Sequence, residues 1–285
     1  FTLAAFAVDS IEGAKEEGAD GGNTWTGWQV GDTDATNFQA YSGKNAIASG
    51  LTQRLYKYNL YGAAAIVTSP MADLQLWGAY WQDTANLWAA QVKFKLPVAE
   101  GLNYNLRGTY LGNTVDDDLK AVAVGAKNGA LYDLRGSLEP TEGEGFDAKL
   151  GGIMFGKKDG FTVNTLEGMS GAKLLAGKEI FYQKGSWLAL AYGQNTYGYV
   201  GAGYTFNGVR LGVEGVYGGT KSEVQNAISG TGTKMELVGE LGWKVNKNLD
   251  FLVWYSNLTT KAKHQTKDDD KSVKDSVRFQ AYYKF

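Results

Sequence analysis

Cysteine is absent from this sequence of 285 residues, and proline occurs only 3 times. Without cysteine the chain has neither disulfide bonds nor thiol chemistry. No apolar run approaches the roughly 20 residues that a membrane-spanning helix needs, which excludes a helical membrane protein. The formal net charge of −2, from 28 basic and 30 acidic residues, gives no broad attraction for nucleic acid.

Glycine and aromatic residues are plentiful, with 39 Gly, 17 Tyr and 8 Trp. This mixture suits many strands joined by tight turns, with aromatic belts at a membrane interface. The last nine residues show the pattern most clearly. They place Val277, Phe279 and Ala281 on one face of a strand, and Arg278 and Gln280 on the other. Such a strand can border lipid on one side and water on the other.

Alternation of this kind recurs in segments of about ten residues, the length that a tilted strand needs to cross a bilayer. The twelve predicted strands are 1–10, 58–69, 73–82, 87–97, 102–111, 129–139, 146–155, 195–206, 209–218, 233–245, 249–258 and 274–285. A soluble β-sandwich with one wet face is the alternative, but its strands usually have about five or six residues. The repeated aromatics near strand ends, such as Tyr80, Trp81 and Trp88, also favour the membrane.

The connections between these strands alternate in length. Short turns are predicted at 70–72, 98–101, 140–145, 207–208 and 246–248. Long segments are predicted at 11–57, 112–128, 156–194, 219–232 and 259–273. This matches the short periplasmic turns and long external loops of outer-membrane barrels. The short link at 83–86 is an exception on the external side, and we expect the wall there to pack against a neighbouring subunit.

The fold class predicted is therefore all-β, an antiparallel transmembrane β-barrel forming a single domain over residues 1–285. The chain opens at Phe1 in a strand-like pattern, without a basic leader or a cleavage site, so we expect residues upstream of it. Charged side chains recur on the face opposite the apolar one and are the predicted pore lining. They are Lys93, Lys95, Arg107, Asp133, Arg135, Asp147, Lys149, Arg210, Glu214, Glu236, Glu240 and Arg278. Each of them could tune the pore or pair with a neighbour for structure; the sequence leaves both open.

The chain resembles the major outer membrane protein porins of Campylobacter and its relatives along its whole length. The stretches that carry the resemblance are LAAFAVDS (3–10), EGAD (17–20), LYGAAA (60–65), YLGN (110–113), LLAGKEIFY (174–182), GYTFN (203–207) and VYGGTK (216–221). Each is weak alone, but their order is specific. The resemblance implies a homotrimer in the bacterial outer membrane with about eighteen strands per barrel, of which this chain would be the C-terminal two thirds.

The loop at 11–57 begins with an acidic stretch that contains Glu12, Glu16, Glu17 and Asp20. If this loop folds inward, the constriction becomes negative and the channel mildly cation-selective. The resemblance also places Asp20 and Glu167 at positions where the family can hold a calcium ion. Two carboxylates supply only part of the oxygen shell that Ca²⁺ requires, and both residues can equally be solvated loop positions. No other cofactor is expected.

The predicted function is passive diffusion of ions and small hydrophilic solutes through a water-filled channel. The first alternative is a substrate-specific channel. The second is an outer-membrane hydrolase that uses His264, the single histidine, which has no evident nucleophile beside it. Expected partners are outer-membrane lipid and lipopolysaccharide, and host surface ligands that bind the external loops. No nucleic acid is expected.

Overall fold

The computed structural model describes residues 1–8, 59–122, 125–162, 192–223, 231–262 and 270–284. The strands are β1 (Thr2–Val8), β2 (Leu60–Thr68), β3 (Ala72–Trp81), β4 (Ala85–Ala99), β5 (Leu102–Val115), β6 (Ala126–Lys127), β7 (Gly129–Pro140), β8 (Gly145–Thr162), β9 (Tyr192–Phe206), β10 (Val209–Lys221), β11 (Gly232–Lys244), β12 (Leu249–Ala262) and β13 (Asp270–Tyr283). A short helix, α3 (Asp117–Val122), follows β5.

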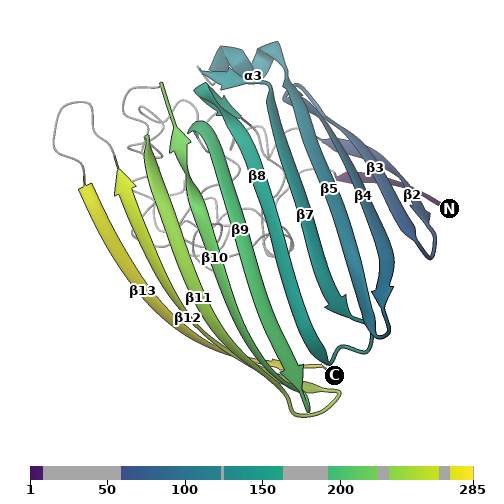
Figure 1. Cartoon of the computed structure of the whole chain (residues 1–285). Coiled ribbons are helices and arrows are strands. Elements are labelled where there is room, and N and C mark those ends of the chain that lie inside the picture. The colour runs from purple at the N-terminus through teal and green to yellow at the C-terminus, as the bar shows by residue number, and fades with distance from the viewer. Residues whose placement is uncertain (9–58, 123–124, 163–191, 224–230, 263–269, 285) are drawn as a thin grey trace.

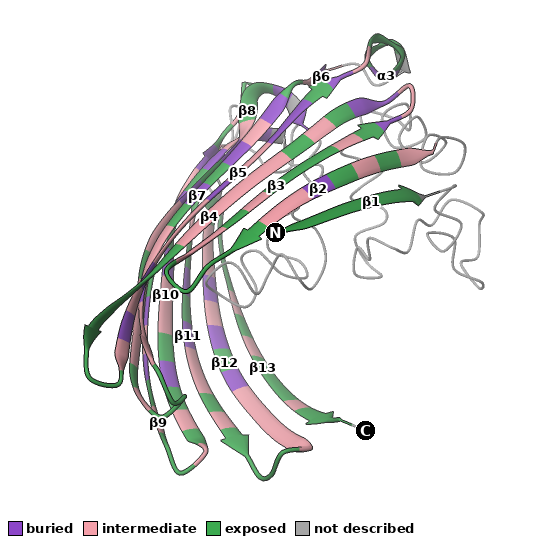
Figure 2. Cartoon of the chain, turned by 90° about the vertical axis from the view of Figure 1, so that its right-hand side faces the viewer, coloured by how far each residue is buried: buried purple, intermediate pink, exposed green. Residues whose placement is uncertain are grey.

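Twelve of these strands form one sheet in chain order, each antiparallel to the next, and only the two-residue β6 stands off the path, pairing in parallel with β8. The predicted all-β antiparallel architecture is thus confirmed. Figure 1 shows the strands side by side in a tilted, curved wall. In Figure 2 the wall curls so that β1 and β13 form its two edges, and these edges are not paired with each other. The six further strands implied by the resemblance stay a prediction.

Several strands are longer than their apolar pattern predicts. β8 has 18 residues and continues to Thr162, and β5 continues to Val115. Part of the segment 112–128, predicted as a loop, is thus the end of β5 followed by α3 and β6. The physical reason is that backbone pairing between neighbouring strands does not depend on side chains, so it extends beyond the segment in which apolar and polar residues alternate.

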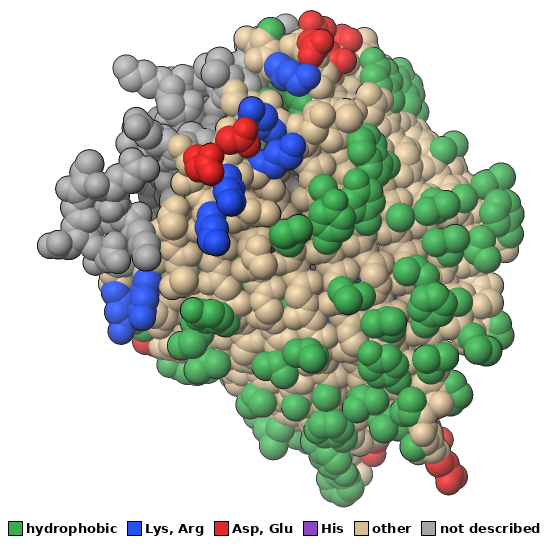
Figure 3. Space-filling model, turned by 45° about the horizontal axis from the view of Figure 1, so that its top comes forward, with side chains coloured by type: hydrophobic (Ala, Val, Ile, Leu, Met, Phe, Trp, Pro, Cys, Tyr) green, Lys and Arg blue, Asp and Glu red, His purple; other side chains and the backbone are tan. Residues whose placement is uncertain are grey.

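The convex face is apolar. Leu150 and Val213 leave 67% and 63% of their surface exposed, as do many other large side chains on this side of the sheet. Figure 3 shows these hydrophobic side chains spread over the convex surface. Aromatic residues such as Tyr204 and Trp243 lie near the ends of their strands, as in the interfacial belts of membrane proteins. So much exposed apolar surface is unfavourable in water and suits contact with lipid.

The opposite face holds a buried apolar cluster toward the end of the sheet that carries α3. It consists of Leu131, Ile153, Phe155, Tyr197, Tyr199, Val216 and Leu258. Charged residues were predicted on this face, so the apolar cluster departs from that prediction. Alternation predicts which side of the sheet a residue occupies but not whether that side stays in contact with water.

Tight turns join the strands at the other end. Asn207 and Gly208 both have positive φ, 49° and 74°, which is the geometry that two-residue hairpins favour and that Asn-Gly adopts readily. The short link between β3 and β4 also contains a positive φ, at Asp83, next to the buried Thr84 and Ala85. Its packing against a neighbouring subunit stays a prediction. Among the described residues, no helix has the length and apolar character that crossing a membrane would require.

Candidate functional site: the charged belt of the concave face

The twelve charged residues predicted to line a pore all lie on the face opposite the exposed apolar side chains. The pairing register shows this directly, because residues opposite each other on neighbouring strands share a face. One row joins Lys93, Arg107 and Arg135 on β4, β5 and β7. A second row joins Asp147 on β8, through glycines on β9 and β10, to Glu240 on β11. We call this set of charges the charged belt.

The three cations of the first row stand directly opposite one another. Like charges in such positions repel, so the arrangement is unfavourable unless other groups compensate it. Asp133 offsets part of it: its Oδ2 accepts a hydrogen bond from Arg107 Nη2 at 2.8 Å. The side chains of Arg107 and Asp133 are only 12% and 2% exposed. The hydroxyl of Tyr199 on β9 donates to the other oxygen, Oδ1, at 2.7 Å. The carboxylate thus links three strands.

Arg210 on β10 binds two carboxylates at once. Its Nη2 and Nε donate to Asp147 Oδ1 and Oδ2 at 2.7 and 3.2 Å, and its Nη1 pairs with Glu240 Oε1. The guanidinium lies over Gly203 and Gly212, the two glycines between those carboxylates. A Cβ atom at Gly203 would lie 2.7 Å from Asp147 Oδ2, so any larger residue would require the Asp147 and Arg210 side chains to move. The glycines therefore let the arginine lie flat along the wall.

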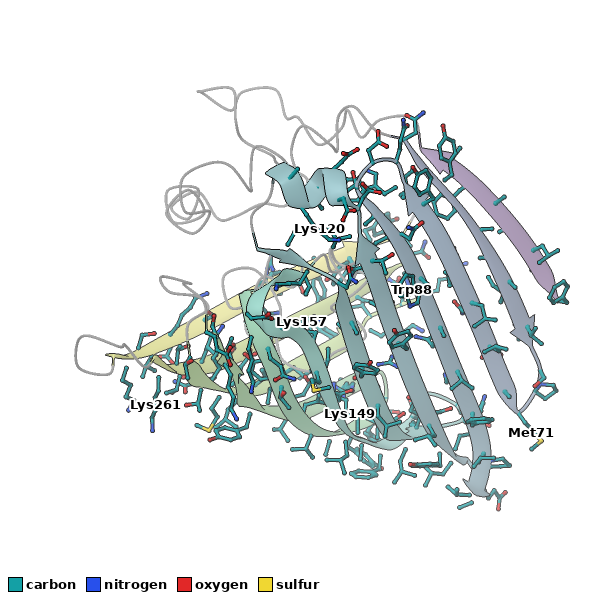
Figure 4. The ribbon with its side chains drawn as sticks, turned by 90° about the horizontal axis from the view of Figure 1, so that it is seen from above. Met71, Trp88, Lys120, Lys149, Lys157 and Lys261 are labelled. Carbon is teal, nitrogen blue, oxygen red and sulfur yellow. The ribbon has the colours of Figure 1, made fainter. Side chains whose placement is uncertain are left out.

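A second ion pair lies across a glycine in the next row of the same face. Lys149 on β8 forms an ion pair with Glu214 on β10 across Gly201, where an added Cβ would lie 2.8 Å from Lys149 Cε. The ring of Tyr199 likewise crosses Gly151 to reach Asp133. Figure 4, seen from above, shows Lys149 on the β8 part of the wall. Four glycines, Gly151, Gly201, Gly203 and Gly212, thus form a flat floor under the ion pairs, which we call the glycine floor.

Not every member of the belt meets open water. Glu236 is 0% exposed and accepts a hydrogen bond from Ser256 Oγ at 2.6 Å, so it is a buried polar contact between β11 and β12. Within the described ranges Lys93, Lys95 and Arg278 make no ion pair. Among the described residues, the belt consequently combines cations that have no carboxylate partner there with carboxylates that are paired.

Sequence reasoning missed Tyr199, Ser256 and the glycine floor. Tyr199 and Ser256 have no charge to distinguish them from other polar strand residues. The floor did leave a signal, the alternate glycines Gly201 and Gly203 in one strand, which place a smooth strip on one face. Several other predictions fall outside the described residues: the calcium ligands Asp20 and Glu167, the acidic stretch near residue 12, and His264. In the part of the chain that is described, no group of three or more metal-ligating side chains occurs.

Replacing Gly203 by valine should lift the Arg210 guanidinium off the wall, because the new side chain occupies its place. We expect a smaller single-channel conductance and a free energy of unfolding lower by about 1–3 kcal/mol, the usual cost of overpacking. Recordings in planar bilayers and urea unfolding would measure the two effects. Gly239→Val is the matched control, since no heavy atom lies within 4 Å of a Cβ at Gly239. Equal conductance in the two variants would contradict the role assigned to the floor.

Antiparallel strands that present an apolar face outward and a charged face inward define a transmembrane β-barrel of the outer-membrane type. The sequence profile of the family described as Campylobacter major outer membrane protein matches residues 1–285. The chain therefore belongs to the Campylobacter major outer membrane protein family, and its location is the bacterial outer membrane. A search of curated proteins finds no match.

Solved outer-membrane channels share the fold. OpdL of Pseudomonas aeruginosa has 14% sequence identity and a TM-score of 0.54, over 79% of this chain and 58% of its own. A BenF-like porin of Pseudomonas fluorescens has 14% identity and a TM-score of 0.52, over 78% and 55%. OccAB3 of Acinetobacter baumannii has 12% identity and a TM-score of 0.52, over 79% and 56%. The chain thus spans a little over half the length of these structures.

Proposed function

We propose that the protein forms a water-filled channel for the passive diffusion of ions and small hydrophilic solutes. The observation that carries this proposal is the charged belt, in which charges of both signs, several of them paired, lie along the concave wall over the glycine floor. Opposed charges produce a transverse field that orients polar solutes without a closed pocket. The fold shared with a BenF-like porin supports the same reading.

Purified protein in planar bilayers should show stepwise, water-filled conductance that does not saturate with one solute. A preparation that inserts and shows no conductance steps would remove the proposal. Saturation by a single solute would instead favour a substrate-specific channel. One solved structure with this fold is OpdK of Pseudomonas aeruginosa with vanillate. Aromatic carboxylates are therefore the first solutes to compare with neutral sugars of similar size.

Mild cation selectivity is the finer part of the proposal. In the described wall, the single positive charge of Arg210 is shared between two carboxylates, Asp147 and Glu240. Arg210→Gln should leave both negative and raise the cation-over-anion permeability ratio about twofold, which corresponds to about 0.4 kcal/mol. Reversal potentials in a salt gradient measure this ratio. Lys284→Gln is the control, because the Lys284 side chain is exposed at the end of the wall and forms just a 3.5 Å ion pair with Asp250 among the described residues. An unchanged ratio in Arg210→Gln would count against a belt that sets selectivity.

The remaining proposals rest on family membership and on residues outside the described ranges. They are assembly as a homotrimer, contact with outer-membrane lipid, a calcium ion held by Asp20 and Glu167 without any required cofactor, and adhesion to host ligands through the external loops. A non-enzymatic role also belongs here. A hydrolase acting through His264 would lose turnover of peptide or phospholipid in His264→Ala.

A further inference from the structure

A second group of charges lies at the rim of the sheet, away from the charged belt. It stands where α3, β6 and the end of β8 meet, at the end of the sheet opposite the tight turns. Figure 3 shows basic and acidic side chains gathered along this rim, beyond the hydrophobic surface. Figure 4 shows Lys120 and Lys157 near each other at this corner. The charges that occupy the corner are thus separate from those that face the concave side.

The backbone of this corner is held in place by contacts from several directions. β6 pairs in parallel with β8, with Lys127 opposite Thr162. Asn128 Oδ1 accepts a hydrogen bond from Val115 N at 2.9 Å, and Lys158 O accepts one from Glu223 N at 2.7 Å. Leu119, fully buried, anchors α3 to the rest of the chain. The lysines therefore project from a backbone that hydrogen bonds and packing hold in place.

A cavity of about 430 Å³ opens between these elements. Its lining residues are Lys120, Gly125, Ala126, Lys127, Asn128 and Lys157. Every charged residue of the lining is a lysine. Asn128 also lines the cavity, so the lining combines three lysines with one amide side chain. Such a surface is complementary to an oxyanion.

Neighbouring carboxylates neutralise this charge only in part. Lys127 Nζ lies 3.1 Å from Asp159 Oδ2, and Lys120 Nζ lies 2.7 Å from Asp117 Oδ1, yet neither aspartate lines the cavity. The hydrogen bond from Lys120, with its charge, lowers the pKa of the Asp117 carboxyl, which stays ionised and competes for that lysine. Lys157 is exposed and makes no direct ion pair in the described ranges, although the charge of nearby Asp159 acts on it through space. Lys157 is accordingly the cation most available to a ligand.

We propose that this corner binds a phosphate monoester, which in the outer membrane the head group of a phosphorylated lipid can supply. Three features support this ligand: the cationic lining, a volume that admits one phosphate with its substituent, and a place at the rim just beyond the apolar surface. Lipid phosphates lie at that level of a bilayer, next to the hydrocarbon region. Inorganic phosphate has the same chemistry and is the other possible source.

The test compares the full chain with the Lys127→Gln/Lys157→Gln double variant in detergent. The probes are diphosphorylated lipid A, the same lipid after dephosphorylation, and inorganic phosphate. We expect the double variant to bind diphosphorylated lipid A at least tenfold more weakly, because two charge-assisted contacts are lost. Lys261→Gln is the matched control, an exposed rim lysine on β12 that does not line the cavity. Circular dichroism melting shows whether each variant keeps its fold.

The three probes separate the possible outcomes. If the double variant binds diphosphorylated lipid A more weakly and inorganic phosphate as before, the site is assigned to a lipid phosphate. Weaker binding of inorganic phosphate alone supports the site and assigns the free ion. If the double variant binds both phosphorylated probes as the unsubstituted chain does, the proposal is overturned. It is also overturned if dephosphorylated lipid A binds as tightly as the phosphorylated form and inorganic phosphate does not bind. Single-channel conductance should be the same in all variants, so failure here leaves the channel proposal untouched.

Discussion

Replacing Asp133 by alanine is expected to lower the free energy of unfolding by about 3–5 kcal/mol, the range observed when one partner of a buried ion pair is removed. Arg107 would keep its charge in a site where its side chain is only 12% exposed. The Tyr199 hydroxyl would lose its acceptor at the same time. Urea unfolding in detergent micelles, followed by tryptophan fluorescence, measures the change.

The control for this variant is the exposed ion pair of α3. Asp117→Ala removes the partner of Lys120, and both side chains are largely exposed, so no measurable change in stability is expected. The comparison shows whether the loss of stability comes from the burial of the ion pair or from the loss of any ion pair. If Asp133→Ala unfolds at the same urea concentration as Asp117→Ala, the carboxylate does not hold β5, β7 and β9 together as the contacts indicate.

Leu150→Arg is expected to make folding into lipid less favourable by about 2–4 kcal/mol, as found for a cation near the middle of the bilayer on the lipid face of a barrel. Leu150 is 67% exposed on the convex face and lies opposite Val200, itself exposed. The measurement is reversible unfolding from lipid vesicles.

The matched variant for this second prediction is Gln280→Arg. Gln280 is on β13, opposite Leu252 and on the same face as Arg278, so the new charge adjoins the concave side. We expect it to change stability by less than about 1 kcal/mol. Equal losses in the two variants would show that the convex face is not the one in contact with hydrocarbon.

Alternation in the sequence was sufficient to predict the twelve strands that follow one another in the sheet, and their faces. In 102–111 it separates Leu106 from Arg107, and in the structure these residues lie on opposite sides of β5, as predicted. It could not predict where β8 ends, because pairing with β9 reaches Lys157 and, after an irregularity, resumes at Phe161, beyond the point where the apolar period stops. α3 and β6 were missed for a related reason: six and two residues are too short for any period to show.

The partners of individual charges were beyond sequence reasoning. Arg210 contacts Asp147, 63 residues away, and Glu240, 30 residues away. These contacts depend on the stagger between β8, β10 and β11, which the turns set and the alternation does not. Two roles were left open for each charge, pore tuning and structural pairing. Arg210, Lys149 and Arg107 are in fact paired, and tuning by Lys93, Lys95 and Arg278 stays a prediction.

The glycine floor has a consequence for how the proposed channel can diversify. Charged side chains that lie flat against the backbone occupy little of the pore cross-section. The path of the backbone therefore sets the pore diameter. Exchanging one charge for another at Lys149 or Glu214 can then reverse the local field while the diameter stays constant. Ion selectivity and conductance can then change independently of each other.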